Sequence, residues 1–448
     1  MKKVITYGTF DLFHEGHQRL LSRAKNLGDY LIVGVTTENY DKTRGKLNVH
    51  DDLMKRIENV KNTGLADEII IEEYEGQKIN DIQKHKIDIF VIGSDWVGKF
   101  DYLKNYCEVI YLERTKGISS TSLRAENSGI MKMGMIGYGR IARRFIKESK
   151  YVSGVNIEGV FGRHEDSLEK FSEENELAFH TTDFEQFLDK VDSVYIASPH
   201  LSHYDYIKRS IMAGKHVLCE KPLVLSTEQA NELYDLAEKH KRVLLEAIKT
   251  AFAPGFIRLI GLAKSGVIGQ VKSVEATFTK LVSGDCRELR SEDAGGSMTE
   301  LASYPLLAII KLLGEDIRKI QFYSHMKDNV DLFTQFSICY DHAIATGKVG
   351  LGVKSEGDLK ISGTKGYIYA PAPWWKTEYF EVRFEDQTQN QKFFYKFEND
   401  GLRYELAEFV SMVQTNRLST YKLSRSESKS IISVIDKFLG GGEVTYLK

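Results

Sequence analysis

The chain has 448 residues, too many for one compact core, so we expect two or three domains. Its formal net charge is −2 with acidic and basic residues interspersed, which argues against nucleic acid or an anionic membrane as a partner. No apolar stretch approaches the ~20 residues of a membrane span, and the start MKKVITYG lacks the apolar region of a signal peptide. We therefore expect a cytoplasmic protein whose four widely spaced cysteines are buried free thiols.

The N-terminal stretch KVITYGTFDLFHEGHQRLL predicts a strand, a tight turn and a helix. The apolar strand stops at Gly8, a helical pattern starts at Glu15, and Gly28 supplies the helix stop. His14 and His17 lie at the helix start, where free backbone N–H groups and the helix dipole favour phosphate. Two imidazoles one turn apart can both donate to phosphate oxygens, which indicates a phosphoryl-transfer site. A surface helix with two incidental histidines is the alternative.

The motif GTFDLFHEGH resembles the HxGH motif of the nucleotidyltransferase superfamily, and residues 1–126 are similar to glycerol-3-phosphate cytidylyltransferases. The stretches GSDWVGKFDYLK (93–104) and RTKGISST (114–121) follow in the family's order and spacing. The resemblance implies that an acceptor's phosphate oxygen attacks the α-phosphorus of CTP and releases pyrophosphate, with Mg²⁺ bridging triphosphate oxygens. It assigns nucleotide binding to Gly8, Thr9, Phe10, Arg44, Lys46, Asp95, Trp96, Arg114, Gly117, Ile118, Ser119 and Thr121.

The same resemblance makes His14, His17 and Arg56 the catalytic residues, which would stabilise the charge developing on the α-phosphate. Arg56 is preferred to its neighbour Lys55 by its distance from the next motif, ADEIII. Ser94 and Lys116 stand where family members often have acidic residues, so the acceptor can differ from that of the glycerol enzymes.

Four apolar runs in this part of the chain predict strands that alternate with helices: DYLIVGVTT, ADEIII, IDIFVIG and EVIYLE. This order implies a parallel, Rossmann-like sheet with right-handed crossovers. Ligands of such a sheet bind at the carboxyl ends of the strands, where the paired histidines and the GSDW stretch are expected.

A second domain starts after a short polar joint at residues 127–129. A strand over 132–136 leads into Gly137-x-Gly139-x-x-Ala142, the dinucleotide fingerprint in its alanine variant. The next strand, VNIEGVF, is followed by Gly162 and Arg163, where NAD enzymes usually carry an acidic residue. Arg163 suits a ribose 2′-phosphate and favours NADP, while the adjacent His-Glu pair leaves NAD open.

Two further motifs are SVYIASPHLSH (193–203) and AGKHVLCEKPL (213–223). With the fingerprint they resemble the glucose–fructose oxidoreductase and inositol dehydrogenase (Gfo/Idh/MocA) superfamily, whose mark is Glu-Lys-Pro after the fifth strand. The resemblance extends from about residue 132 to the C-terminus and implies an NAD(P)-binding Rossmann domain. It assigns cofactor binding to Gly137, Tyr138, Gly139, Arg140, Ile141, Gly162, Arg163, Ser198, Pro199, His200, His203, Glu220 and Lys221.

Lys221 and Tyr304 are the predicted catalytic residues of this part. A lysine beside the nicotinamide can polarise a carbonyl, and a phenol beside it can protonate the alkoxide. Many relatives have histidine at the Tyr304 position, whereas the similar dihydrodiol-dehydrogenase branch has tyrosine. Lys249, with Arg287 and Arg290 nearby in sequence, favours a phosphorylated substrate.

Downstream, the segments KSVEATFTK, FTQFSICY, GDLKISG and KGYIYA predict an open, largely antiparallel sheet. The family uses such a sheet for dimerisation, so we expect a homo-oligomer, either a dimer or a tetramer. The predicted domains are residues 1–126 (cytidylyltransferase), 130–250 (Rossmann) and 251–448 (α+β substrate and dimerisation domain). Two closing helices are expected to pack back on the Rossmann part.

Together the two halves suggest a bifunctional enzyme. The second half would reduce a ketose phosphate with NADPH, and the first would couple the alditol phosphate to CTP. Two routes are favoured: from fructose 6-phosphate to CDP-mannitol, or from ribulose 5-phosphate to a CDP-pentitol. The product would supply the synthesis of capsule or teichoic acid. Two alternatives stay open: a non-catalytic dimerisation module fused to a cytidylyltransferase, and an oxidoreductase that acts on the CDP-linked product.

Overall fold

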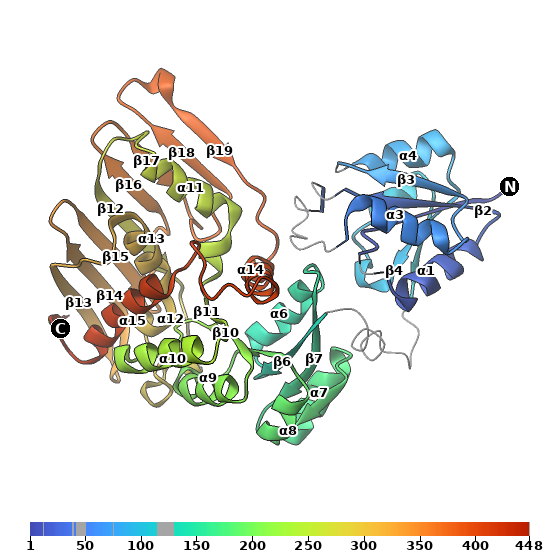
Figure 1. Ribbon diagram of the computed structural model, residues 1–448. Helices are drawn as coiled ribbons and strands as arrows, with labels where there is room; N and C mark the ends of the chain where they lie inside the picture. Colours follow the sequence, from blue (N-terminus) through green and yellow to red (C-terminus); the bar gives the residue numbers. More distant parts are fainter. Residues whose placement is uncertain (12, 38–39, 42–50, 75, 114–129, 448) are drawn as a thin grey trace. The chain divides into compact units, whose positions relative to one another are not determined.

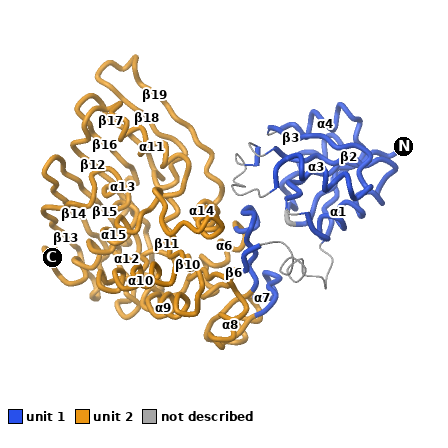
Figure 2. Tube along the Cα trace, viewed as in Figure 1, with its two compact units in different colours: residues 1–132, 149–158, 172–179 blue, residues 133–148, 159–171, 180–448 orange. Residues whose placement is uncertain are grey.

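The computed structural model describes residues 1–11, 13–37, 40–41, 51–74, 76–113 and 130–447. The chain forms two compact units (Figure 2). One contains residues 1–132, 149–158 and 172–179, and the other contains residues 133–148, 159–171 and 180–448. Three sheets organise the described chain (Figure 1). The predicted boundary between Rossmann and substrate domains at residue 250 stays a prediction.

The first sheet is a five-stranded parallel sheet in the order β3-β2-β1-β4-β5. Its strands are β1 (Lys3–Gly8), β2 (Tyr30–Thr36), β3 (Glu68–Glu72), β4 (Ile89–Gly93) and β5 (Glu108–Leu112). The strands are apolar on both faces because helices cover both. The strand order changes direction between β1 and β4, and at such a point the carboxyl ends open into a crevice that binds ligands.

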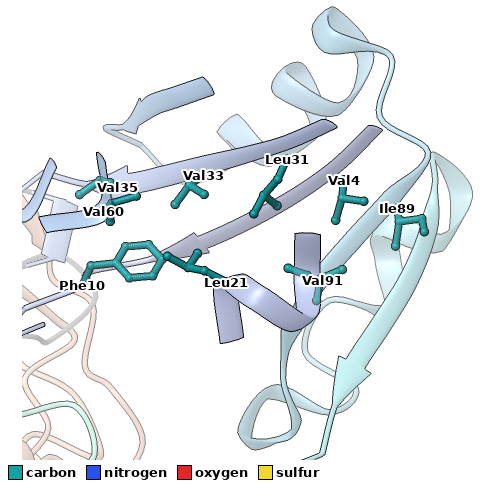
Figure 3. Close-up of a cluster of buried hydrophobic side chains, with 10 residues drawn as sticks. Val4, Phe10, Leu21, Leu31, Val33, Val35, Val60, Ile89 and Val91 are labelled. Carbon is teal, nitrogen blue, oxygen red and sulfur yellow. The ribbon is translucent and has the colours of Figure 1, made fainter. Parts of the chain in front are cut away.

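Two buried clusters hold helices onto this sheet. On one face, Leu21 of α1 (Glu15–Lys25) and Val60 of α3 (Leu53–Asn62) pack with the strand residues Val4, Leu31 and Val33 (Figure 3). On the other face, a second cluster contains Ile82 of α4 (Gln77–His85) and Leu103 of the short η2 (Asp101–Asn105). The predicted parallel α/β architecture is confirmed.

The second sheet has six strands in the order β11-β10-β9-β6-β7-β8. They are β6 (Met131–Ile136), β7 (Val155–Phe161), β8 (Phe179–Thr181), β9 (Ser193–Ile196), β10 (His216–Glu220) and β11 (Leu244–Ala247). The connecting helices are α6 (Arg140–Ser149), α7 (Glu165–Glu174), α8 (Phe184–Asp189), α9 (His203–Met212) and α10 (Thr227–Lys239). The order changes direction between β6 and β9, so the same rule predicts a second crevice where the fingerprint turn and the Ser-Pro-His loop begin.

The third sheet has nine strands in the order β19-β18-β17-β16-β12-β15-β14-β13-β20. They are β12 (Val271–Thr279), β13 (Lys319–Lys327), β14 (Val330–Cys339), β15 (Ile344–Gly350), β16 (Leu359–Gly363), β17 (Tyr367–Ala370), β18 (Tyr379–Arg383), β19 (Gln391–Phe394) and β20 (Val444–Leu447). Only the pairs β12/β15 and β13/β20 are parallel among the described strands of this sheet. The prediction of a largely antiparallel sheet is confirmed.

Helices α12 (Ser297–Leu301) and α13 (Ser303–Leu313) lie against this sheet, and α11 (Pro254–Lys264) and α15 (Arg425–Leu439) pack on α13 (Figure 1). The C-terminal α15 also binds the Rossmann part. Asp436 accepts hydrogen bonds from the backbone N–H and the hydroxyl of Thr227 at 2.9 and 2.7 Å, and Ser428 donates to Glu246. Lys311 of α13 donates to Glu427 at 2.7 Å.

All four cysteines are free, as predicted, but only Cys219 is buried; Cys339 is exposed, which corrects the expectation of four buried thiols. Within the described ranges, no helix combines the length and apolarity needed to cross a membrane.

Candidate active sites

The rings of His14 and His17 stack at the N-terminus of α1 with centroids 3.8 Å apart. His14 is the N-cap residue, and its Nδ1 accepts a hydrogen bond from the backbone N–H of Gly16 at 3.0 Å. Because Nδ1 is an acceptor here, the neutral ring carries its proton on Nε2 and can donate it to a ligand. A side chain at Gly16 would meet the His14 ring at 2.9 Å, so glycine is required between the two histidines.

Phe10 packs against His17, one member of this pair. Its backbone is in the left-handed region, at φ 54, and its ring is buried in the cluster of Leu21 and Val60 (Figure 3). The ring meets His17 edge-on, with centroids 5.4 Å apart. The predicted contact between Phe10 and CTP would therefore have to come from its backbone, since its side chain belongs to the core.

Arg56 anchors the turn that follows β1. Its guanidinium donates to the backbone oxygens of Thr9 (3.0 Å), Thr36 (2.7 Å) and Asp51 (2.9 Å). Asp41 lies 3.5 Å from Arg56 Nη1 and also accepts a hydrogen bond from the hydroxyl of Thr9 at 3.0 Å. The structure places Arg56 against the motif, whereas the alternative, Lys55, is exposed and pairs with Glu58.

The remaining nucleotide-site predictions are only partly described. Gly8 ends β1, and Trp96 is half-buried against Phe100, with ring centroids 5.8 Å apart. Asp95 lies in the short helix η1 (Ser94–Trp96), but its side chain is outside the described part. Seven predicted residues lie outside the described residues altogether: Arg44, Lys46, Arg114, Gly117, Ile118, Ser119 and Thr121.

A buried polar cluster near this edge was not predicted. Lys78 of α4 forms an ion pair with Glu72, the last residue of β3, and its ammonium lies 4.5 Å from the ring centre of Tyr7. The Tyr7 hydroxyl donates to Asp81 at 2.8 Å. In sequence, Lys78 and Asp81 are indistinguishable from the solvated face of an amphipathic helix, so only the fold reveals them.

In the second crevice, the fingerprint glycines form the turn between β6 and α6. Gly137 has φ +102, and a side chain there would meet the backbone oxygen of Ala197 at 2.7 Å. A side chain at Gly139 would meet nothing within 4 Å, so this turn leaves space for a pyrophosphate to approach the backbone. The described residues therefore fit a dinucleotide at this position.

Tyr138 and Gly162 are in close contact: a side chain at Gly162 would lie 2.4 Å from the Tyr138 ring. Arg163 follows β7 and is exposed, as is its neighbour His164. Arg140 is the first residue of α6, and its guanidinium pairs with Glu288 at 2.9 Å, while the next residue, Ile141, is half-buried.

Glu300 of α12 gathers three basic side chains. His200 Nε2 lies 2.9 Å and Arg287 Nη2 lies 2.7 Å from its Oε1. Lys221 Nζ donates to the Glu300 backbone oxygen at 2.7 Å and lies 4.0 Å from Oε2. Burial alone would raise the pKa of Glu300, but the His200 hydrogen bond and the charges of Lys221 and Arg287 hold it well below its usual range. Glu300 is thus a carboxylate that orients Lys221.

Both predicted cofactor histidines have roles within the protein that sequence reasoning did not foresee. Burial lowers the pKa of His200, so its neutral ring donates to Glu300. His203 is fully buried, and its ring nitrogens face the backbone oxygens of Ser198 and Pro222, each at 3.0 Å. The His203 contacts join the loops after β9 and β10, and the His200 contact joins the loop after β9 to α12. Pro199 itself is exposed, and the Lys221–Pro222 peptide is cis.

Tyr304 lies in α13 and is 7% exposed. Burial, followed by the negative charges of Glu220 and Glu405, raises its pKa well above the ordinary value. The phenol is therefore protonated throughout the neutral range and can serve as a proton donor. Glu220 is itself held in place because it accepts a hydrogen bond from the Tyr195 hydroxyl at 2.6 Å.

The two crevices define two classes of site: a histidine-paired helix start suited to nucleotidyl transfer, and a glycine turn suited to a dinucleotide. Residues 5–126 match the cytidylyltransferase-like family. Residues 131–247 match the NAD-binding Rossmann fold of the Gfo/Idh/MocA oxidoreductase family, and residues 256–369 match that family's C-terminal domain.

Two similar proteins cover different parts of the chain. A stretch of 130 residues is 56% identical to glycerol-3-phosphate cytidylyltransferase of Bacillus spizizenii, covering 29% of this chain and all of that protein. A stretch of 199 residues is 30% identical to dTDP-3,4-didehydro-2,6-dideoxy-α-D-glucose 3-reductase of Actinomadura kijaniata, covering 43% of this chain and 58% of that protein.

A solved 3-ketoreductase of Actinomadura kijaniata, in complex with NADP and TDP-benzene, has the same fold over 71% of this chain and all of its own. The TM-score is 0.64 at 21% identity. The chain thus belongs, in its N-terminal part, to the glycerol-3-phosphate cytidylyltransferase family, and this domain is fused to a Gfo/Idh/MocA oxidoreductase. It is an enzyme with two activities, nucleotidyl transfer and reduction.

Proposed function

We propose that the enzyme reduces a ketose phosphate to an alditol phosphate with NADPH and couples that product to CTP, giving a CDP-alditol and pyrophosphate. Fructose 6-phosphate and ribulose 5-phosphate are the proposed substrates. The product would be CDP-mannitol or a CDP-pentitol, for a surface polymer such as capsule or teichoic acid. The proposed setting is a cytoplasmic homo-oligomer.

One observation carries the choice of a phosphorylated substrate: the cations around Glu300 outnumber its single negative charge. Lys221 and Arg287 both lie beside this carboxylate. Arg287 Nη1 is buried and has no hydrogen-bond partner among the described residues. A buried donor without a partner is costly, and a substrate phosphate would supply the acceptor and the missing negative charge.

The two other basic residues that sequence analysis favoured for phosphate are less suitable. Arg290 is already paired with Asp285 at 2.6 Å. Lys249 lies in an acidic environment, because the carboxylates that act on it include Glu405 and Glu220. We therefore propose Arg287 as the phosphate ligand.

In the reduction, NADPH would supply the hydride. Lys221, oriented by the Glu300 backbone oxygen, would donate a hydrogen bond to the substrate carbonyl, and Tyr304 Oη would give its proton to the resulting alkoxide. For the cofactor, the open turn at Gly139 would take the pyrophosphate, and exposed Arg163 would pair with the 2′-phosphate.

In the transfer reaction, the Nε2–H of His14 and the ring of His17 stacked on it would donate to α-phosphate oxygens as charge develops there. Arg56 would hold the Thr9 turn in position. No group of three or more His, Cys, Asp or Glu side chains in the described chain is placed to hold a metal. We propose that Mg²⁺ accompanies the triphosphate of CTP, where it would neutralise charge on the leaving pyrophosphate.

A second candidate is reduction of the CDP-linked product instead of the free phosphate. It is supported by the similarity to a reductase whose name specifies a dTDP-linked sugar. A third, a non-catalytic module, is less well supported because the chain keeps Lys221, hydrogen-bonded to the Glu300 backbone, and a tyrosine that stays protonated, Tyr304.

One assay separates these functions. The protein is mixed with CTP, Mg²⁺, NADPH and each of several ketose phosphates, and NADPH loss and pyrophosphate release are followed together. We expect NADPH loss without CTP, and pyrophosphate release only after reduction. NADPH loss that requires both CTP and an oxidised acceptor would support the CDP-linked candidate, and no loss under any condition would support the non-catalytic module.

Two variants test whether the sites are separate. Lys221→Ala should abolish reduction and leave cytidylylation of an added alditol phosphate intact, and His17→Ala should do the reverse. His85→Ala, which removes a histidine paired with Glu68 at 3.7 Å, is the control and should keep both activities. If either active-site variant loses both activities while still folded, the two-site proposal fails.

A further inference from the structure

Two neighbouring side chains of η5 (Arg287–Leu289) bind partners in two different parts of the reduction site. Arg287 Nη2 lies 2.7 Å from Oε1 of Glu300, whose backbone oxygen holds the predicted catalytic lysine. The next residue, Glu288, accepts a hydrogen bond at 2.9 Å from Nη2 of Arg140, which lies 148 residues earlier in the chain. This short turn therefore links α6, which begins at the dinucleotide turn, to the carboxylate of α12.

The backbone of η5 is packed tightly against the start of α12. The Glu288 backbone oxygen accepts a hydrogen bond from the Gly296 N–H at 3.0 Å. A side chain at Gly295 would lie 2.6 Å from the Glu288 oxygen and 2.7 Å from the Arg287 oxygen, so only glycine allows this approach. Because no side chain separates the two segments, a shift of Glu288 also shifts Arg287 and the start of α12.

The two members of the Arg140–Glu288 pair differ in their access to water. The Glu288 side chain is 14% exposed, whereas the Arg140 side chain is 66% exposed. Burial would raise the pKa of Glu288, but its own backbone N–H and the Arg140 guanidinium hold the pKa below its ordinary value. A carboxylate with little access to water needs a cation, and Arg140 is the cation that the described chain places within ion-pair distance of it.

The exposed partner, Arg140, is the one that a dinucleotide would contact. It directly follows Gly139, where the open turn leaves space for a pyrophosphate. A guanidinium has five N–H donors, and the hydrogen bond to Glu288 uses one of them. The other donors can reach pyrophosphate oxygens, so Arg140 can bind both anions at once. Without the cofactor, the exposed side chain keeps more rotamers, and its restraint on Glu288 is weaker.

We propose that Glu288 is a positioning residue that makes the substrate site depend on the bound cofactor, an inference that rests on the proposed reduction. Arg140 binds the pyrophosphate and Glu288 together, and η5 then presents Arg287 to the substrate phosphate. The substrate therefore binds more tightly to the enzyme–cofactor complex than to the free enzyme. Because binding free energies are linked, the substrate strengthens cofactor binding by the same factor.

The first test measures this coupling in the full-length protein. NADP⁺ is titrated with and without saturating fructose 6-phosphate or ribulose 5-phosphate, a pair that binds without turnover because NADP⁺ carries no hydride. We expect the ketose phosphate to lower the Kd for NADP⁺ about tenfold in the wild type and to leave it unchanged in Glu288→Gln. In steady-state reduction, this variant should raise KM for the ketose phosphate with kcat little changed. A Glu288→Gln protein with wild-type coupling would overturn the inference.

Glu292→Gln is the matched control, because it removes the same charge from an exposed position of the same loop and should keep wild-type coupling. Arg140→Ala should lose the coupling as Glu288→Gln does. The double variant should lose no more than either single variant, since both act through one contact, and additive losses would contradict the proposal. The thermal midpoint of Glu288→Gln without cofactor should change little, because the Arg140 side chain left unpaired is exposed to water.

Amide hydrogen exchange makes the test independent of the substrate. Saturating NADP⁺ alone should slow exchange of the Gly296 N–H, which bonds to the Glu288 oxygen, in the wild type but not in Glu288→Gln. If NADP⁺ leaves this exchange unchanged in the wild type, the inference is wrong whatever the substrate is. If the exchange slows and no ketose phosphate binds, the proposed substrate class fails and the role of Glu288 stands.

Discussion

Arg56 and Asp41 form an ion pair, with Nη1 and Oδ2 3.5 Å apart, in which both side chains are fully buried. Arg56 also donates to three backbone oxygens around the Thr9 turn. Arg56→Lys keeps the charge but cannot make this set of bonds, so we expect cytidylyl transfer to fall about 10²-fold. Pyrophosphate release measures the loss of cytidylyl transfer, and NADPH oxidation should be unchanged in the same variant. Lys55→Ala, at the adjacent exposed position, should behave like the wild type; the opposite result would shift the catalytic register to Lys55.

Gly16→Ala should damage the nucleotidyl-transfer site through His14. The new methyl group would lie 2.9 Å from the His14 ring, so the ring would leave its stack on His17. We expect cytidylyl transfer to fall by about tenfold or more, with the thermal midpoint changing little. As the control, Gly261→Ala introduces a methyl group where nothing lies within 4 Å and should preserve the transfer. Equal activity in both variants would show that the histidine stack is not needed.

Arg163→Ala should lower the preference for NADPH over NADH. The exposed guanidinium after β7 is the proposed partner of the 2′-phosphate, which NADH lacks. We expect KM for NADPH to rise about tenfold or more while KM for NADH stays constant. Lys170→Ala removes another exposed cation nearby, on α7, and should leave both values unchanged. A parallel rise for both cofactors would indicate a contact common to the two.

Asp331→Asn should change how stability depends on pH. Asp331 is 4% exposed and accepts hydrogen bonds from the Met298 backbone N–H at 2.9 Å and the Thr334 hydroxyl at 2.8 Å. Burial raises its pKa from 3.8 to about 7. Between these values the folded state binds more protons than the unfolded state, so the stability contributed by Asp331 falls as pH rises.

Asparagine does not ionise, so the variant should gain on the wild type between pH 4 and 7, by up to about 4 kcal/mol. Urea unfolding at pH 5 and pH 8 checks this difference. Parallel free energies of unfolding for the two proteins at both pH values would contradict it.

Local sequence patterns predicted the strands and the motif turns well. The apolar run over β1 and the turn at Gly8 predict where the stacked histidines lie, and the turn at Gly137 predicts the dinucleotide crevice. Both predictions are possible because strand, turn and helix start are adjacent in sequence. Lys221 was also predicted from its motif. The structure adds that its ammonium is bonded to the backbone of Glu300.

The partners that come from distant segments were not predictable. Asp41, Lys78 and Glu405 carry no local signal, because a charged residue in a helical or polar pattern is usually solvated. Only tertiary packing buries Asp41 against Arg56 and leaves Glu405 without a hydrogen bond. For the same reason, sequence proximity grouped Arg287 with Arg290, although the first faces Glu300 and the second is paired with Asp285.

The position of α15 sets an order of folding during synthesis. Asp436 binds Thr227, which emerges from the ribosome 209 residues earlier, and Ser428 binds Glu246. The oxidoreductase part therefore completes its packing only after α15 has been synthesised, whereas the strands of the five-stranded sheet are complete by Leu112. Domains generally fold as units, beginning with the N-terminal one. A product cut short before α15 would thus carry a finished cytidylyltransferase fold on an unfinished reductase.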